Sequence, residues 1–91
     1  MAYRLLYLPG VEKDIQVLPG RVIERVRHGL ERLAENPRLG KPLHGELVPF
    51  WSYWVGDYRA VYEIRDEELI VLVVMLGHRR EIYERARRKR R

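Results

Sequence analysis

Two short polar segments in the second half of the 91-residue chain combine arginine with histidine and tyrosine. The first is Gly56-Asp57-Tyr58-Arg59, and the second is Gly77-His78-Arg79-Arg80-Glu81-Ile82-Tyr83. Arginine side chains stay charged and bind phosphate oxygens through paired hydrogen bonds. Histidine exchanges a proton near neutral pH. Together the segments predict a site that holds a phosphate group and transfers a proton beside it.

Each segment adjoins one strand of a predicted β-hairpin. Residues 58–64 alternate in character, as in a strand with two different faces. Residues 69–76 are apolar throughout, which is typical of a central strand covered on both sides. The polar residues 65–68 form the connection, and Gly77 is predicted to end the second strand.

The register of this hairpin decides which side chains meet. With the turn centred near residues 66–67, opposite residues in antiparallel strands have numbers that sum to roughly 133. Arg59 is then predicted across from Val74, and the residues before Arg59 lie beside those that follow Leu76. Five side chains distant in sequence are therefore expected to converge at one end of the hairpin: Arg59, His78, Arg79, Arg80 and Tyr83.

Further helix and strand signals surround the hairpin. Apolar residues at helical spacing over 22–34 predict the clearest helix. It should end at Asn36-Pro37, because the residue before proline disfavours helical geometry. The other predicted elements are a strand at 3–8, a helix at 11–18 separated from the next by Pro19-Gly20, a short strand near 43–47 within a loop, a strand at 50–55 and a helix at 80–88.

This order of elements predicts an α+β fold: an N-terminal strand, a helical hairpin, an antiparallel sheet of three to four strands, and a short C-terminal helix. We expect one domain over residues 1–91, with a basic tail from about 84 to 91. The absence of cysteine excludes disulfides, thiolate zinc sites and a cysteine nucleophile. The longest apolar run is too short for a membrane span, and the N-terminus does not resemble a signal peptide, so a cytoplasmic protein is expected.

The positive charge is concentrated at one end of the chain. From His78 to Arg91 there are eight arginines and lysines against two glutamates, a net charge of +6, whereas the remainder carries −1. Such a field attracts nucleic acid or an acidic protein. The alternative is a solvated tail that only aids solubility.

Structural roles compete with functional ones for most of these residues. Arg59 could pair with Asp57 or Glu63, and Arg79 and Arg80 could be solvated at the start of a helix. Tyr83 could be a packing residue, and His78 a structural histidine. The aromatic residues Trp51, Tyr53 and Trp54 are more readily explained as core or partner-covered side chains than as a stacking platform. His28 and His44 are more readily explained as surface residues.

The sequence resembles the RelE family of the RelE/ParE toxin superfamily over residues 3–83. Four features carry the resemblance: Leu33 followed by Asn36-Pro37, the loop 43–47, the segment 56–62 and the segment 77–83. It implies a toxin of a type II toxin–antitoxin pair that cleaves messenger RNA on the ribosome without a metal or other cofactor. The 2′-hydroxyl would attack the adjacent phosphorus and leave a cyclic phosphate. The implied partners are a cognate antitoxin, in a toxin–antitoxin hetero-oligomer, together with messenger RNA and the ribosome.

The resemblance also implies roles for single residues. Arg59 and Arg79 would stabilise the charged transition state, and Tyr83 would position or activate the 2′-hydroxyl or stack on a base. His78 would exchange a proton, as the best candidate base in a chain whose strand at 50–55 lacks the cations of the family. The remaining basic side chains expected to contact RNA are Arg80, Arg85, Arg87 and Arg88.

Two other functions remain open at this point. A ParE-type toxin uses the same fold to inhibit DNA gyrase, and a non-catalytic homologue would only bind nucleic acid or the ribosome. The His78-Arg79-Arg80 cluster with Tyr83 favours the ribonuclease. The missing strand cations favour the other two.

Overall fold

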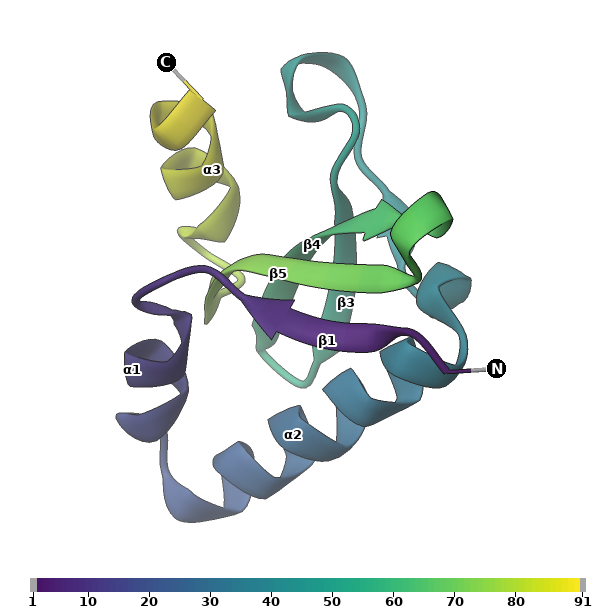
Figure 1. The fold of residues 1–91 in the computed structure, drawn as a ribbon. Coiled ribbons are helices and arrows are strands. Elements are labelled where there is room, and N and C mark those ends of the chain that lie inside the picture. The colour runs from purple at the N-terminus through teal and green to yellow at the C-terminus, as the bar shows by residue number, and fades with distance from the viewer. Residues whose placement is uncertain (1, 91) are drawn as a thin grey trace.

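One five-stranded sheet, with strand order β1-β5-β4-β3-β2, organises residues 2–90, the part of the chain that the computed structural model describes (Figure 1). The strands are β1 (Arg4–Tyr7), β2 (Lys41–Pro42), β3 (Trp51–Val55), β4 (Tyr58–Arg65) and β5 (Ile70–His78). The helices are α1 (Val11–Gln16), α2 (Gly20–Glu35) and α3 (Ile82–Arg90), and the 3-10 turns are η1 (Pro37–Leu39), η2 (Gly45–Leu47) and η3 (Asp66–Glu68).

The predicted α+β fold is confirmed. The five-stranded sheet consists of the expected N-terminal strand and four strands that pair antiparallel. Strands β2 to β5 pair antiparallel, and β1 lies parallel to β5. The prediction of a short strand near 43–47 is wrong. These residues contain η2, and the strand lies at Lys41–Pro42 instead. Gly45 adopts a φ of 63°, a left-handed conformation that interrupts an extended strand.

Helices cover both faces of the sheet, as Figure 1 shows with α1 and α2 below it and α3 above it. Val26, Leu30 and Leu33 of the amphipathic α2 pack against β4 and β5 on the first face. Ile82 and Ala86 of α3 are buried on the second face. The apolar residues of β5 therefore enter two cores, which agrees with the prediction of a central strand.

The predicted hairpin register is wrong by three positions, because Arg59 pairs with Gly77 and not with Val74. The connection is longer than expected: it contains η3 and then Leu69 at a φ of 55°, so that Arg65 pairs with Ile70. A further shift between Val61 and Tyr62 leaves Val74 as an extra residue on β5. As a result β5 continues past Gly77 to His78.

The backbone of α2 lies close to β3 at Gly29. A Cβ atom at this position would lie 2.9 Å from the Tyr53 ring and 3.3 Å from Val55. With a larger residue here, either the helix or the Tyr53 ring would have to shift. Among residues 2–90, no helix is both long enough and apolar enough to cross a membrane.

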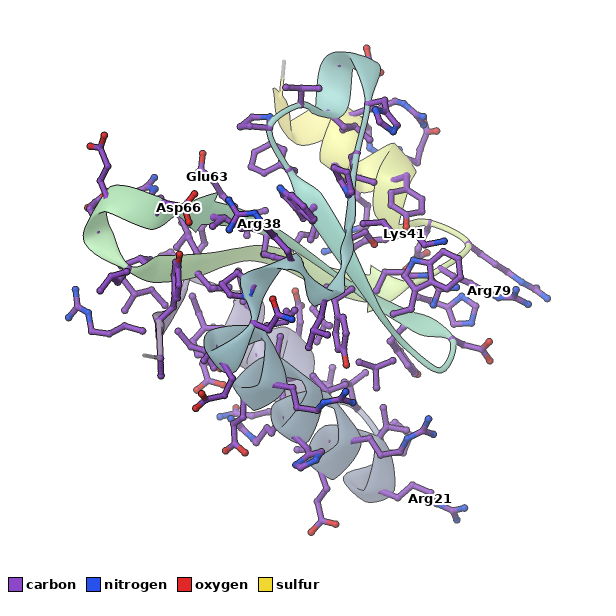
Figure 2. All side chains as sticks on the ribbon, turned by 90° about the vertical axis from the view of Figure 1, so that its right-hand side faces the viewer. Arg21, Arg38, Lys41, Glu63, Asp66 and Arg79 are labelled. Carbon is purple, nitrogen blue, oxygen red and sulfur yellow. The ribbon has the colours of Figure 1, made fainter. Side chains whose placement is uncertain are left out.

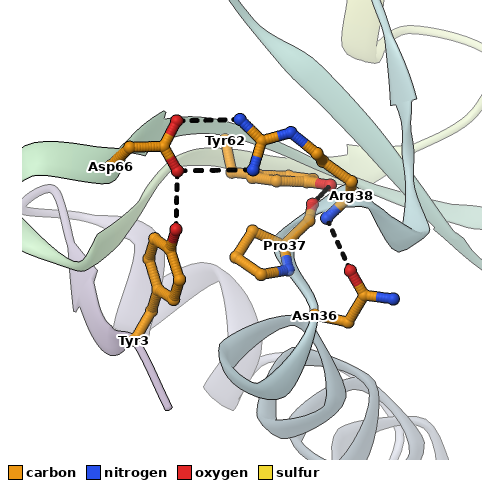
Figure 3. Close-up of polar contacts among 6 residues, drawn as sticks. All are labelled: Tyr3, Asn36, Pro37, Arg38, Tyr62 and Asp66. Atoms are coloured by element: carbon orange, nitrogen blue, oxygen red, sulfur yellow. Dashed lines mark hydrogen bonds and ion pairs between the residues drawn. The ribbon is translucent and has the colours of Figure 1, made fainter. Parts of the chain in front are cut away.

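A polar network joins the residue before β1 to η1 and η3, as Figure 3 shows. The Tyr3 hydroxyl donates to Asp66 Oδ1 at 2.6 Å, and the Arg38 guanidinium donates to both Asp66 oxygens at 2.8 and 3.3 Å. These hydrogen bonds hold the pKa of Asp66 below its ordinary value and raise the pKa of Tyr3. Burial raises the pKa of the neighbouring Tyr62, whose hydroxyl donates to the Pro37 carbonyl, to about 12.

Candidate nucleic-acid interface and cleavage site

The two polar segments do meet at one end of the β4–β5 hairpin. Tyr58 pairs with His78, and beyond this pair the Arg79 N–H donates to the Asp57 carbonyl at 2.7 Å. The Arg79 Nε also lies 3.4 Å from Asp57 Oδ1, while more than half of the Arg79 side chain stays exposed. The predicted convergence is therefore confirmed for the backbone, and the corrected register brings the segments closer than expected.

The sheet divides the predicted site residues between its two faces. Side chains alternate along a strand. Ala60 lies in the core beside α2 and Val61 in the core beside α3. This alternation puts Arg59 on the α3 face and Tyr58 with its partner His78 on the α2 face. The site residues thus share one end of the hairpin but do not all share one face.

Arg59 is almost completely buried and binds to its own turn. One guanidinium nitrogen donates to the carbonyls of Gly56 at 2.7 Å and Tyr58 at 3.0 Å. The guanidinium carbon lies 4.3 Å from the centre of the Trp54 ring, a cation–π contact. Neither ion pair considered from the sequence is present, since Asp57 contacts Arg79 and Glu63 contacts Arg65. Arg59 therefore supports the turn and supplies a fixed positive charge beneath the indole.

His78 holds the start of the segment that follows β5. Its Nδ1 accepts a hydrogen bond from the Arg80 N–H at 3.2 Å, and its ring packs edge-on against Tyr58 at 5.7 Å. A neutral imidazole whose Nδ1 accepts must carry its proton on Nε2. In this arrangement His78 can donate a hydrogen bond, but its accepting nitrogen is already occupied.

Tyr83 reaches from α3 to the sheet. Its hydroxyl shares a hydrogen bond with the hydroxyl of Ser52 at 2.9 Å, and Ser52 on β3 is buried. Ser52 and Trp54 are two residues apart on one strand, so they lie on the same face as Arg59, the cross-strand partner of Trp54. Tyr83, Trp54 and Arg59 therefore form one group on the α3 face.

Lys41 is a candidate that the sequence did not reveal. The strand at 50–55 contains no cation, but β2 pairs Lys41 with Ser52, and the Lys41 Nζ lies 5.0 Å from the centre of the Trp54 ring. Because β2 and β4 lie on opposite sides of β3, Lys41 and Arg59 approach Trp54 from different strands. In Figure 2 Lys41 and Arg79 project on the same side of the molecule. A two-residue strand has no periodicity by which it could have been predicted.

The three aromatic residues of β3 have different surroundings. Trp51 and Tyr53 pack against the main core, as expected. Trp54 is 54% exposed although two cations contact its ring. A hollow of about 180 Å³ lies beside it, with Lys41 and Ser52 in its wall. Trp54 is therefore accessible to a ligand.

Among the described residues, neither Lys41 nor Arg59 has an acidic side chain within 4.0 Å, so the two positive charges beside Trp54 are not neutralised. No three histidine, aspartate or glutamate side chains in residues 2–90 gather as metal ligands would. The arrangement is suited to binding a phosphate and an adjacent base.

Two of the arginines expected to contact RNA make contacts within the molecule. Arg85 lies 3.7 Å from Asp14 on α1 and donates to the Leu76 carbonyl at 3.4 Å. Arg87 lies 3.0 Å from Glu46 in η2. Arg80 and Arg88 are exposed. An RNA contact for these four side chains stays a prediction.

Comparison with known proteins decides the family. A model of the family described as ParE toxin of the type II toxin–antitoxin system matches residues 5–83. The chain belongs to this family, within the RelE/ParE superfamily. The resemblance inferred from the sequence is confirmed. The matched range contains Lys41, Trp54, Arg59, Arg79 and Tyr83, and it ends before the arginines of the C-terminal tail.

Individual RelE/ParE members are similar over almost the whole chain. Toxin RelG of Mycobacterium tuberculosis is 34% identical over 93% of this chain and the whole of the relative. The toxin–antitoxin complex RelBE2 of the same organism contains a chain with 32% identity and a TM-score of 0.80, covering 87% of this chain and 93% of that one. A free E. coli RelE mutant with two arginines replaced by alanine has 28% identity and a TM-score of 0.80, with 98% of each chain covered.

Proposed function

We propose that this RelE/ParE family member is an endoribonuclease that cleaves messenger RNA on the ribosome and so inhibits translation in the cytoplasm. One observation carries the proposal: the un-neutralised cations Lys41 and Arg59 flank the exposed Trp54, close to the hydroxyl pair of Ser52 and Tyr83. This group offers a phosphate site, a stacking surface and a hydroxyl beside one another. The similarity to toxins RelG and RelE supports it.

The proposed reaction needs no group beyond the protein and the RNA. The 2′-oxygen forms a bond to the adjacent phosphorus as a base takes its proton, and the bond from phosphorus to the 5′-oxygen breaks as that oxygen gains a proton. The products are a 2′,3′-cyclic phosphate and a free 5′-hydroxyl. Lys41, Arg59 and the exposed Arg79 stabilise the extra negative charge on the non-bridging phosphoryl oxygens. The hydroxyl of Tyr83 contacts the 2′-hydroxyl.

The partner that we propose is an antitoxin that binds this chain in a hetero-oligomer. Solved relatives include toxin–antitoxin complexes of M. tuberculosis and E. coli. An acidic, amphipathic segment of such a partner would neutralise the charges of the site and cover Trp54.

Primer extension on a translated message, after brief expression of the chain, tests the proposal. Wild type is expected to produce new 5′ ends within the coding region, and Arg79→Ala and Lys41→Ala are expected to reduce them. A message that stays intact while translation continues would contradict the proposal. Intact RNA with loss of DNA supercoiling would instead support a ParE-type gyrase inhibitor.

A pair of variants tests the role of the Tyr83 hydroxyl. Tyr83→Phe removes the group proposed to contact RNA, whereas Ser52→Ala removes only its partner at 2.9 Å. If the hydroxyl takes part in the reaction, Tyr83→Phe lowers the cleavage rate about 100-fold, and Ser52→Ala lowers it only a few-fold. If the two variants lower the cleavage rate equally, the Tyr83 hydroxyl acts only through its hydrogen bond to Ser52 and takes no part in the reaction.

A further inference from the structure

A second hollow, of about 230 Å³, lies between α2 and the edge of β3. Arg25, His28 and Arg32 line it from the helix, and Trp54, Val55 and Gly56 line it from the strand and the turn that follows. We call this hollow the α2–β3 groove. Apart from Gly56, it contains none of the residues that the family resemblance singled out.

The groove exists because β2 is short. Strand β2 pairs only with Trp51 and Ser52, so the second half of β3 has no neighbouring strand on the side away from β4. Gly29 provides the other condition, since its missing side chain lets α2 lie against Tyr53 and Val55. An open strand edge and a close helix together make a channel along the surface.

The helix side of the α2–β3 groove is cationic. Arg25, His28 and Arg32 are spaced by three and four residues, which places them on one stripe of α2. Arg21, at the end of α2 in Figure 2, extends the same stripe. In the described part of the chain no acidic group lies within 4.0 Å of Arg25 or Arg32, although Arg27 on another side of the helix contacts Glu12.

The groove and the proposed cleavage site lie on opposite faces of the sheet and meet at the open edge of β3, at Trp54. This residue is part of the wall of both hollows, and it is 54% exposed. Lys41 and Arg59 contact its ring on the cleavage side, and Arg25 lies close to Gly56 on the groove side. A chain of phosphates that leaves the cleavage site at Trp54 would meet cations along α2.

We propose that the α2–β3 groove binds the backbone of single-stranded RNA next to the nucleotide that is cleaved. This inference rests on the proposed function, because it assigns the groove to the same RNA strand. Unpaired arginines beside an exposed indole are suited to phosphates and bases. An acidic polypeptide is the less suitable ligand. Its apolar side chains would need exposed apolar partners in the groove, whereas Tyr53 and Val55 are already partly buried against α2.

Binding of an RNA that cannot be cleaved tests the groove directly. The probe is a single-stranded RNA of about 12 nucleotides with 2′-O-methyl riboses, a length within the usual site sizes of single-strand binders. Its affinity for the full chain is measured by fluorescence anisotropy over a range of KCl concentrations. Arg25→Gln/Arg32→Gln is the test variant. Arg4→Gln/Lys13→Gln is the matched control, because it removes two exposed charges on β1 and α1.

The salt dependence gives the expected result. Each phosphate contact on a single strand contributes roughly 0.7 to the slope of log affinity against log salt, so the test variant should lower the slope by about 1.4. Its affinity at low salt should fall about tenfold, while the control keeps the wild-type slope. Thermal melting of each variant checks that the fold is retained. An unchanged slope in a folded test variant would overturn the proposal, as would an equal loss in the control.

Two further outcomes separate this inference from the proposed function. If wild type fails to cleave a translated message but binds the probe through Arg25 and Arg32, the cleavage proposal fails and the groove remains. If wild type cleaves, and the test variant binds the probe and cleaves as well as wild type, only the proposal that the groove binds RNA fails. A test variant that loses affinity for poly-glutamate but not for the RNA probe would assign the groove to an acidic polypeptide and overturn the RNA proposal.

Discussion

At the scale of single residues, two arginines of the same hairpin end have opposite surroundings. Arg59 is 7% exposed and donates to two carbonyls of its own turn. Arg79 lies on the surface, with its Nε 3.4 Å from Asp57. Arg59 therefore supports the turn and supplies a fixed charge beneath the Trp54 ring, whereas Arg79 is free to contact a ligand directly.

Alanine at these two positions should separate stability from activity. Arg59→Ala leaves carbonyl groups without donors and is expected to lower the free energy of unfolding by about 1–3 kcal/mol. Arg79→Ala breaks only an exposed contact and should change it by less than about 0.5 kcal/mol, yet lower the cleavage rate about 100-fold or more. Urea denaturation and primer extension measure the two effects. A large loss of stability in Arg79→Ala would argue against this division.

The contacts of His78 favour a positioning role over proton transfer. Its Nδ1 holds the Arg80 N–H, and its ring lies on the face opposite to Trp54 and Arg59. An asparagine can accept the same hydrogen bond but cannot exchange a proton. We therefore expect His78→Asn to retain most of the cleavage rate and His78→Ala to lose several-fold. If both variants lose activity equally, and by about 100-fold, His78 transfers a proton.

At the scale of elements, the short strand β2 controls the position of Lys41. Gly40 precedes it, and a Cβ atom there would lie 2.5 Å from the Ser52 carbonyl oxygen and 2.6 Å from the Tyr62 hydroxyl. Only a residue without a side chain lets β2 approach β3. The contact of Lys41 with Trp54 therefore depends on the glycine that precedes Lys41.

Gly40→Ala should damage both stability and the site. The methyl group would force β2 away from β3 and is expected to lower the free energy of unfolding by about 1–3 kcal/mol. Gly20→Ala is a matched control, since no atom lies within 4 Å of its Cβ position, and alanine suits the first turn of α2. Urea denaturation compares the two. Equal stability of Gly40→Ala and wild type would contradict the close approach of these strands.

At the scale of the whole molecule, Asp66 connects three elements that are far apart in the sequence. Tyr3 directly precedes β1 and Arg38 lies in η1, and both donate to Asp66 at the turn before β5 (Figure 3). The hydrogen bonds lower the pKa of Asp66 below its ordinary value of 3.8. Its contribution to stability is therefore fully present above pH 3.8 and is lost as the pH falls through the lowered pKa.

Asp66→Asn tests this dependence on pH. The variant should unfold at a lower urea concentration than wild type at pH 7, and the difference should narrow as the pH falls below 3.8, where wild type also loses the charge. Glu67→Gln serves as control, because it removes an exposed acidic group of the same turn. A difference that stays constant from neutral to low pH would show that the network acts through its shape alone. The raised pKa of Tyr3 predicts a second loss of stability as the pH rises above 10.0.

The positive charge of the molecule is less confined to the tail than its sequence indicates. Arg85 and Arg87 contact acidic groups on α1 and η2, which connects α3 to the rest of the fold. Arg25, Arg32 and Lys41 instead leave un-neutralised charge near Trp54. Net charge counted along the chain therefore did not locate these cations near Trp54.

The sequence by itself determined the types of the main elements and the end of the hairpin where the polar segments meet. Helical spacing defined α2, and the apolar run at 69–76 defined β5, because these periodicities depend only on which faces are buried. The motifs at 56–59 and 77–83 adjoin the two strands of the hairpin, so the predicted hairpin also predicted that the motifs meet. They also carried the family resemblance, which needs no coordinates.

Only the tertiary structure decided which side chains touch. The longer turn and the extra Val74 shifted the register by three, so Arg59 faces Gly77. The shared face of Tyr83, Trp54 and Arg59 follows from this pairing, as does the separation of His78 from them. Lys41 reaches Trp54 only because two residues pair with β3. Local periodicity cannot encode these contacts, since each depends on how distant segments pack against one another.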